Sequence, residues 1–287
     1  MKKAILGAVL VFSAAALFAQ LPGQKFTLSA RGGWGLYCGG DYNTAAEGYN
    51  DYINAFYPLG PGRYDKFRTG FNASLEGVYW FKPNMGVGLG LGWYQSSISD
   101  NPVDFDDEYF DTFYNINASV GVMPVTLNFH YQLPICRDSF LDFYFGAGLY
   151  FGCFDFHKDY EYEFYDDIGT YDFSGHTTAL GLQGGVTFNY PIVKDKIWLF
   201  GGVEGRTTSL SDFSDEWTEA GSDYMGPYGG SGTGHQFWVF DQLVGNEKFP
   251  LFYFGENMPT ASDIQNSRKG SVGGGGISFY IGAKVGF

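Results

Sequence analysis

The last eleven residues of the chain alternate strictly between apolar residues and others. From Ile277 to Phe287 every second residue is apolar, and serine, tyrosine, glycine and lysine lie between them. A period of two is the pattern of a β-strand with one apolar face. Seven earlier segments alternate in the same way: 26–37, 71–81, 85–94, 114–131, 141–151, 180–190 and 197–206. We therefore expect an all-β chain with eight antiparallel strands.

The connections between these segments alternate in length. Those after the odd-numbered segments are long, at residues 38–67, 98–112, 154–175 and 209–271, and those after the even-numbered segments are short. Short turns on one side and long loops on the other are typical of transmembrane β-barrels. The pattern predicts an up-and-down barrel with long extracellular loops and short periplasmic turns.

The fourth segment changes phase beside Pro124. Its apolar residues are even-numbered from Tyr114 to Val122 and odd-numbered from Val125 to Tyr131. If both halves turn their apolar side chains to the same face, the strand needs one extra residue. Proline is tolerated in sheets at edges and at bulges. We therefore expect a β-bulge at this proline.

Alternation does not tell which face of a barrel is outside, because a lipocalin-type barrel also alternates. Aromatic residues at both ends of the apolar strips favour an outward, lipid-facing apolar surface. Near the long loops these are Trp34, Trp93, Tyr114 and Phe151. The other face is rich in glycine, serine and tyrosine, and its few charges are balanced in sign. We expect those charges to form ion pairs that fill the barrel: Arg31, Glu76, Asp142, Glu204, Arg206 and Lys284.

The terminal strand also carries a recognisable motif. Tyr280, Gly282, Val285 and Phe287 have the spacing of the assembly signal of bacterial outer-membrane β-barrels, which the chain resembles. Residues 122–131 and 143–148 are similar to a recurring pair in the small barrels related to OmpX, OmpW and the membrane domain of OmpA. The resemblance implies an eight-stranded transmembrane β-barrel in the outer membrane of a diderm bacterium. It also implies contact with the barrel assembly machinery, outer-membrane lipid and lipopolysaccharide.

The start of the chain and its composition fit a secreted membrane protein. Residues 1–19 have two lysines, an apolar run and a small residue before Gln20, the pattern of a signal peptide. We expect residues 20–287 to form a single barrel domain. The formal net charge of −14 argues against nucleic-acid binding, because phosphate needs a basic face.

The long connections are strongly acidic. They contain 26 of the 31 aspartates and glutamates, counted along the sequence, but six lysines and arginines. Asp104, Asp106, Asp107 and Glu108 form the densest group and are weak candidates for a calcium or magnesium site. Their spacing does not match an EF-hand loop. The alternative is a solvated acidic face, and we expect no cofactor.

The connection 209–271 contains apolar stretches that do not alternate. Phe237, Trp238, Phe240, Phe252 and Phe254 would form a lid over the barrel mouth or a surface for a partner. A lipid-facing hairpin that makes a ten-stranded barrel is the alternative.

The sequence indicates no enzyme, because its four histidines are scattered and lack a clear nucleophile. We expect a structural or surface-interaction role through the acidic loops, with an extracellular partner. A narrow conduit for a small, hydrophobic molecule is the main alternative. A lipid-modifying outer-membrane enzyme is a remote one.

Overall fold

The computed structural model describes residues 25–56, 63–107, 110–136, 139–162, 167–193 and 196–287. The proposed signal peptide lies outside these residues. The elements that build the ring are β1 (Lys25–Tyr37), β2 (Thr69–Lys82), β3 (Met85–Asp107), β4 (Phe110–Cys136), β5 (Ser139–Tyr162), β6 (Asp167–Val193), β7 (Ile197–Ser211) and β13 (Gly276–Gly286). The others are α2 (Gly40–Phe56), β8 (Ser214–Asp223), β9 (Gly226–Val244), β10 (Glu247–Gly255), β11 (Ile264–Lys269) and β12 (Ser271–Gly273).

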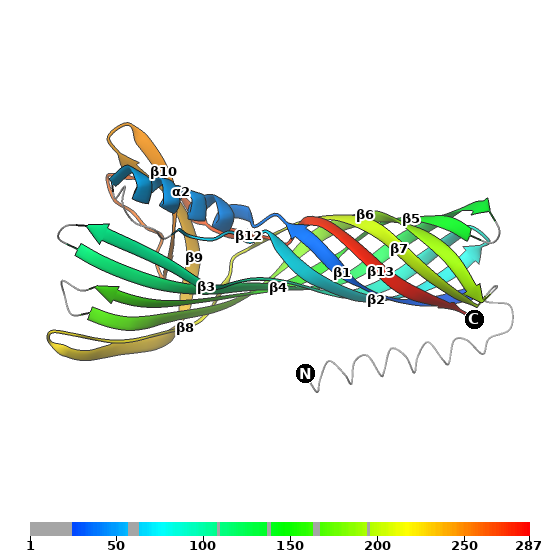
Figure 1. Ribbon diagram of the computed structural model, residues 1–287, viewed down its shortest axis with the longest axis horizontal. Coiled ribbons are helices and arrows are strands. Elements are labelled where there is room, and N and C mark those ends of the chain that lie inside the picture. Colours follow the sequence, from blue (N-terminus) through cyan, green and yellow to red (C-terminus); the bar gives the residue numbers. More distant parts are fainter. Residues whose placement is uncertain (1–24, 57–62, 108–109, 137–138, 163–166, 194–195) are drawn as a thin grey trace.

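Eight of the described strands form a closed antiparallel ring. β1 through β7 pair in chain order, and β13 closes the ring between β7 and β1. Figure 1 shows the ring at one end of an elongated molecule, with the carboxyl terminus at its outer edge. The predicted strands and their order are therefore observed.

Alternation places apolar side chains outside the ring. Leu180 and Ile281 are 79 % and 76 % exposed, and Leu89 is 64 % exposed, although all three are large and apolar. Their sequence neighbours point inward, because successive side chains of a strand alternate between its faces. The ring thus has an apolar outer wall and a mainly polar interior.

The expected bulge at Pro124 is wrong. β4 runs through this proline with unbroken pairing to β5, and the irregularity on its β3 side lies between Ile98 and Asn101 instead. The even-numbered residues Ile116 to Val122 point inward and are buried. The phase of the apolar pattern changes because the inner face itself becomes apolar beyond the ring.

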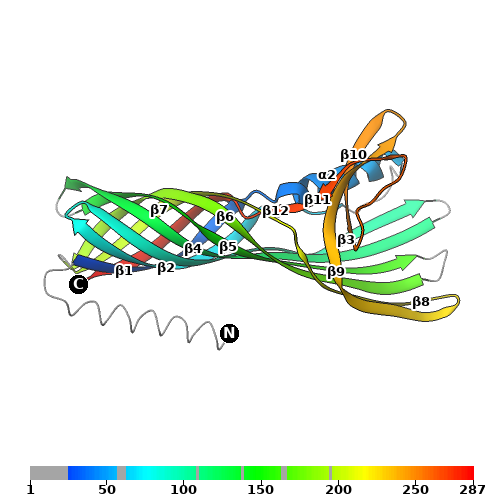
Figure 2. The same ribbon diagram turned by 180° about the vertical axis from the view of Figure 1, so that it is seen from behind.

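Two predicted loops are strands. β3 and β4, and likewise β5 and β6, continue as paired strands well past the end of the ring, through most of 98–112 and 154–175. β6 exchanges partners on the way: Gly181 pairs with Thr208 of β7, and Ile168–His176 pairs with β8. We call this sheet of β3, β4, β5, β6 and β8 beyond the ring the distal sheet (Figure 2).

The other two long connections cover one face of the distal sheet. Residues 38–67 contain α2, and 209–271 contains the β9–β10 hairpin with β11. These elements, which we call the cap, lie together on one side in Figures 1 and 2. The buried cluster between cap and sheet is built on aromatic residues, including Tyr42, Phe67, Phe154, Phe173, Phe237 and Phe252. The distal sheet and cap therefore form a packed apolar core of their own.

Within the part of the chain that the structure describes, no helix has the length and apolar character needed to cross a membrane.

Candidate functional site

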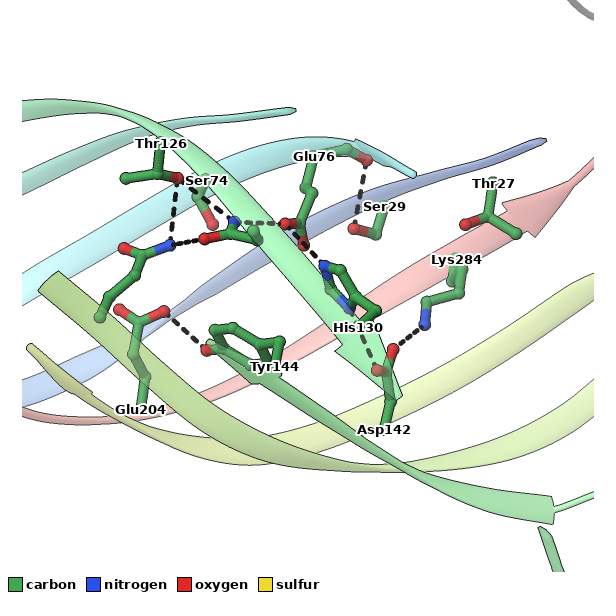
Figure 3. A network of polar contacts seen from close by, with 12 residues as sticks. Thr27, Ser29, Ser74, Glu76, Thr126, His130, Asp142, Tyr144, Glu204 and Lys284 are labelled. Carbon is green, nitrogen blue, oxygen red and sulfur yellow. Dashed lines mark hydrogen bonds and ion pairs between the residues drawn. The ribbon is translucent and has the colours of Figure 1, made fainter. Parts of the chain in front are cut away.

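Charged and polar side chains fill the inside of the ring (Figure 3). Each of the six charged residues expected there lies inside, with little or no exposure: Arg31, Glu76, Asp142, Glu204, Arg206 and Lys284. Most of these residues are far apart in the sequence, and the closed ring brings them together. They lie on β1, β2, β5, β7 and β13. Three of them are formally positive and three formally negative, so their formal charges cancel.

The half of the network nearer the short turns centres on His130 of β4. Its Nε2 lies 3.1 Å from Oε1 of Glu76, and its Nδ1 lies 3.1 Å from Oδ1 of Asp142. The ammonium of Lys284 donates to the other oxygen of Asp142 at 2.9 Å. Asn128 donates to Glu76 at 2.5 Å. The imidazole therefore links carboxylates from two strands, and Lys284 neutralises one of them (Figure 3).

The middle of the network is the ion pair between Arg31 and Glu204. Nη2 of Arg31 lies 2.6 Å from Oε2 of Glu204. Nη1 of Arg31 donates to the Tyr144 hydroxyl at 2.7 Å, and that hydroxyl donates to the same glutamate oxygen at 2.6 Å. The guanidinium also lies 4.4 Å from the centre of the Tyr280 ring. Charge-assisted bonds of this kind are shorter and stronger than neutral ones.

A second arginine continues the network toward the distal sheet. The guanidinium of Arg206 lies 3.7 Å from the centre of the Tyr94 ring, and its Nη1 donates to Ser278 at 2.6 Å. The Tyr94 hydroxyl donates to the second oxygen of Glu204 at 2.9 Å. Both carboxylate oxygens of Glu204 are thus engaged.

Neutral side chains occupy the remaining interior. Gln183 donates to Thr126 at 3.1 Å and to Asn128 at 3.0 Å, and it accepts from Tyr150 at 3.3 Å. The void beside these residues and Arg31 has a volume of about 10 Å³. A single water needs about that much room. This part of the ring interior therefore has room for about one water molecule.

Glycines on the facing wall make room for the interior aromatic rings. A Cβ at Gly185 would lie 2.7 Å from the Tyr144 hydroxyl, and one at Gly181 would lie 2.6 Å from the Tyr150 ring. Large side chains at these glycines would displace the tyrosines. The space above these two glycines is thus filled by aromatic rings.

Sequence reasoning did not assign His130, Tyr94 or Gln183 to this network. Each lies at an inward position of its strand, and this alternation was the available signal. Which of these polar groups meet across the ring depends on how far each strand is shifted along its neighbours. The alternation of side chains does not contain this information.

The residues proposed as a lid or partner surface are in the cap. Phe237, Phe252 and Phe254 belong to the cluster between cap and distal sheet, and Trp238 and Phe240 are also nearly fully buried. They are in the β9–β10 hairpin, which pairs through β9 with β11 and with β8 of the distal sheet and does not enter the ring. The alternative of a ten-stranded ring is therefore wrong. These side chains are buried by other residues of the same chain, so they offer no open surface.

The four residues of the assembly motif lie on β13 and directly after it. Tyr280 points into the ring, whereas Val285 and Phe287 face outward, and Gly282 lies between them on the strand. The backbone amide of Phe287 donates to the carbonyl of Phe26 at 2.8 Å, which ties the terminus to β1.

The side chains of Asp104, Asp106, Asp107 and Glu108 lie outside the described residues. Among the side chains that are described, no group of three or more histidines, cysteines, aspartates or glutamates has an arrangement that could hold a metal ion.

The solved structures that resemble this chain include two distant neighbours. One is a major outer membrane protein from Thermus thermophilus, with 13 % sequence identity and a TM-score of 0.36; the match covers 92 % of this chain and all of that one. The other is the outer membrane protease OmpT from Escherichia coli, with 8 % identity and a TM-score of 0.30, covering 93 % and 97 %. No protein-family model and no curated protein matches the chain. Both neighbours are outer-membrane proteins, and both are too distant to indicate an activity.

Proposed function

We propose that this chain is an integral outer-membrane β-barrel protein that holds a folded surface-interaction domain outside the cell. The ring is the membrane anchor, closed to solutes by its own side chains. The distal sheet and cap are the extracellular part.

The observation that carries this proposal is the inverted polarity of the ring. Large apolar side chains such as Leu89, Leu127 and Leu180 are highly exposed outside, while six charged side chains are enclosed inside. In water such an outer wall is unfavourable, because apolar surface is stabilised by removal from water at about 25 cal/mol per Å². In lipid the same wall is satisfied, and every backbone group of a closed ring is paired.

Aromatic side chains at the end of the ring with the short turns support the membrane location. Tyr79, Phe129, Tyr190 and Phe287 are all half-exposed on the outer wall there. Tyrosine and tryptophan are enriched at membrane–water interfaces, where one end of the side chain is apolar and the other wet.

The conduit alternative has less support. The void beside Arg31 and Glu76 has a volume of about 10 Å³, and these charged side chains are bound to Glu204 and Asn128. A solute would have to break these ion pairs to pass.

The contacts of two of the four histidines support a non-enzymatic role. Both ring nitrogens of His130 lie next to carboxylates inside the ring. Those of His157, on the distal sheet, lie 2.7 Å from Asp172 and 3.2 Å from Asp159. A general base needs a nitrogen within reach of the proton that it removes. These two imidazoles have none left for a serine hydroxyl.

The partners proposed with this function are outer-membrane lipid and lipopolysaccharide around the ring, the assembly machinery, and an extracellular partner at the distal sheet. The acidic surface of the distal sheet disfavours nucleic acid among them.

Cell fractionation with surface proteolysis tests the proposal. We expect the protein in the outer-membrane fraction, with a shift in gel mobility after heating, as a stable closed barrel gives. Protease added to intact cells should cleave within the distal part and leave the ring fragment protected. Recovery of the protein from the periplasm would contradict the proposed membrane location. Cleavage of the distal part only after the outer membrane is opened would contradict its proposed position outside the cell.

A further inference from the structure

The face of the distal sheet that is turned away from the cap carries a groove of about 440 Å³. Alternation defines this face, because Ile98, Ala118, Phe156 and Phe173 point the other way, into the core under the cap. The groove lies across the strands β3, β4, β5, β6 and β8. Its floor is backbone and short side chains, so it is shallow and open along its length.

Two cross-strand rows of polar residues line the groove. The first contains Ser119, Asp155, Ser174 and Glu216, which are register partners in turn across β4, β5, β6 and β8. The second contains Asn117, His157, Asp172 and Thr218 across the same strands. Directly opposite side chains on one face of a sheet lie about 5 Å apart. The rows therefore present closely spaced hydroxyl, amide, carboxylate and imidazole groups.

The groups in the groove are held in place by one another. Asp155 accepts hydrogen bonds from Ser119 at 3.3 Å and from Ser174 at 2.7 Å. A carboxylate has about four acceptor sites, so two remain for a ligand. His157 is fixed by Asp172 on one side and by Asp159 on the other. The arrangement offers both donors and acceptors on rigid strands.

Three classes of ligand do not fit this groove. An extended peptide cannot add to the sheet there, because β4, β5 and β6 are paired on both sides. Phosphate and sulfate groups would meet Asp155, Asp172 and Glu216, which repel anions. A metal ion has no suitable ligand cluster among the described residues. A polyhydroxylated ligand fits, since sugar hydroxyls both donate and accept along an open surface.

The groove also lies close to the aromatic edge of the outer wall. Trp93 and Phe151, which form the aromatic edge of the outer wall, lie four residues before Ser97 and Asp155 on their strands. Four residues of strand span about 13 Å. The groove therefore opens just beyond the apolar wall, where the sugar headgroups of an outer leaflet would lie.

We propose that this groove is a saccharide-binding site that takes a neutral oligosaccharide, either free or as the headgroup of a glycolipid. Its position at the membrane surface rests on the proposed function, whereas the chemistry of the groove does not. Asp155 and Asp172 accept from vicinal hydroxyls of the sugar, and Ser119 and Ser174 complete the contact on the groove floor.

The test uses the full chain, refolded in a zwitterionic detergent without a sugar headgroup. Maltotetraose, cellotetraose and chitotetraose are titrated against it by calorimetry and saturation-transfer NMR. In a second arm the protein is placed in phosphatidylcholine nanodiscs with and without a neutral glycolipid that has a digalactosyl headgroup, and contacts to its sugars are measured. Binding in the first arm identifies a free saccharide as sufficient, and binding in the second arm alone identifies the glycolipid.

Variants assign any binding to the groove. Asp155→Ala should weaken it at least tenfold, and Ser174→Phe, which fills the floor, should abolish it. Glu161→Gln is the matched control: it changes a carboxylate on the same face of β5, outside the groove, and should leave the affinity unchanged. Gel mobility before and after heating shows that the ring of each variant is folded, and an unchanged rate of proteolysis within 226–255 shows that its distal sheet and cap are folded.

Three outcomes overturn the inference. One is no binding of any saccharide by the folded wild-type chain in either arm. Another is equal binding by the wild type, Asp155→Ala and Ser174→Phe. The third is tighter binding of tetralysine than of every saccharide, with loss in Asp155→Ala, which would make this a site for basic peptides. A chain that fractionates with the outer membrane and binds no saccharide contradicts this inference alone.

Discussion

Arg31 and Glu204 are each the principal charge partner of the other inside the ring. Their 2.6 Å contact lies in a space from which water is nearly excluded. A buried pair of this kind need not stabilise the fold more than apolar residues would, but removal of one partner leaves an uncompensated buried charge. The same reasoning applies to Asp142 and Lys284, at 2.9 Å.

The first prediction concerns this pair. Glu204→Ala should lower the free energy of unfolding by about 3–5 kcal/mol, because it leaves Arg31 buried without its carboxylate. The double variant Arg31→Met/Glu204→Leu should recover part of that loss, because Arg206, whose Nη1 lies 3.8 Å from Oε1 of Glu204, still loses this carboxylate. Urea unfolding in lipid vesicles measures both, with Glu161→Gln as a surface control expected within about 0.5 kcal/mol of the wild type. Additive losses in the double variant would mean that the two residues do not act as a pair.

The second prediction concerns His157, which lies outside the ring. Partial burial disfavours its charged form, but the hydrogen bond with Asp172 and the nearby Asp159 outweigh this, so the pKa of His157 is raised above its ordinary value of 6.5. A folded-state pKa above the unfolded one means that the imidazolium contributes to stability fully at pH below the unfolded pKa. That contribution is lost as pH rises through the raised pKa. NMR titration of the imidazole should show the raised pKa, and Asp172→Asn should lower it. An unchanged pKa in the variant would contradict the assigned cause.

At the scale of elements, the sequence predicted the ring well and the distal part poorly. The strands of the ring alternate between lipid-facing and inward positions, so their pattern has a clear period. Beyond the ring the same strands turn their apolar side chains inward, as Ile116 and Val120 do, to pack under the cap. Because the period stays at two while the apolar face changes sides, the sequence suggested a bulge at Pro124 and loops at 98–112 and 154–175.

The cap escaped prediction for a related reason. α2 carries many small and polar residues. Its buried positions, such as Tyr42 and Ile53, can be identified only from the residues that pack on them in the structure. Those partners come from β5 and β10, which lie more than 100 residues away in the chain. Contacts between residues so far apart in the sequence stabilise this helix. A local sequence pattern does not contain them.

The third prediction tests the outer wall of β3. Leu89→Arg should cost about 2–4 kcal/mol of folding free energy in lipid, because its outward side chain would place a charge near the middle of the bilayer. Leu89→Met, with similar volume and no charge, should cost less than about 1.5 kcal/mol. Equilibrium folding into vesicles gives both values. Equal costs would indicate that this face does not meet lipid.

The fourth prediction separates the cap from the ring. The Phe154 ring is fully buried and lies 5.6–6.3 Å from rings that include Phe67, Phe237 and Phe254. Phe154→Ala should cost about 3–5 kcal/mol locally. We expect faster proteolysis within 226–255 while the gel shift of the ring on heating is kept. Simultaneous loss of both would mean that cap and ring unfold as one unit.

At the scale of the whole molecule, charge is divided between two regions. The formal net charge is −14, and most of the acidic residues lie in the four long connections, which form the distal sheet and cap. Inside the ring, by contrast, the charges of the six residues cancel. The division fits a neutral anchor in lipid and an acidic domain in water. The sequence predicted the six interior charges because alternation identifies inward positions, but not the pairing among them.

Closure of the ring by its own side chains is the central claim. Planar-bilayer recordings of the refolded full chain test it most directly, with insertion verified by protease protection of the ring. We predict no steady current above the bare bilayer, and stepwise conductance should appear after Arg31→Ala/Glu204→Ala opens the middle of the ring. Steady, reproducible pores in the wild-type protein would contradict the claim, because a void of about 10 Å³ between paired charges cannot conduct ions.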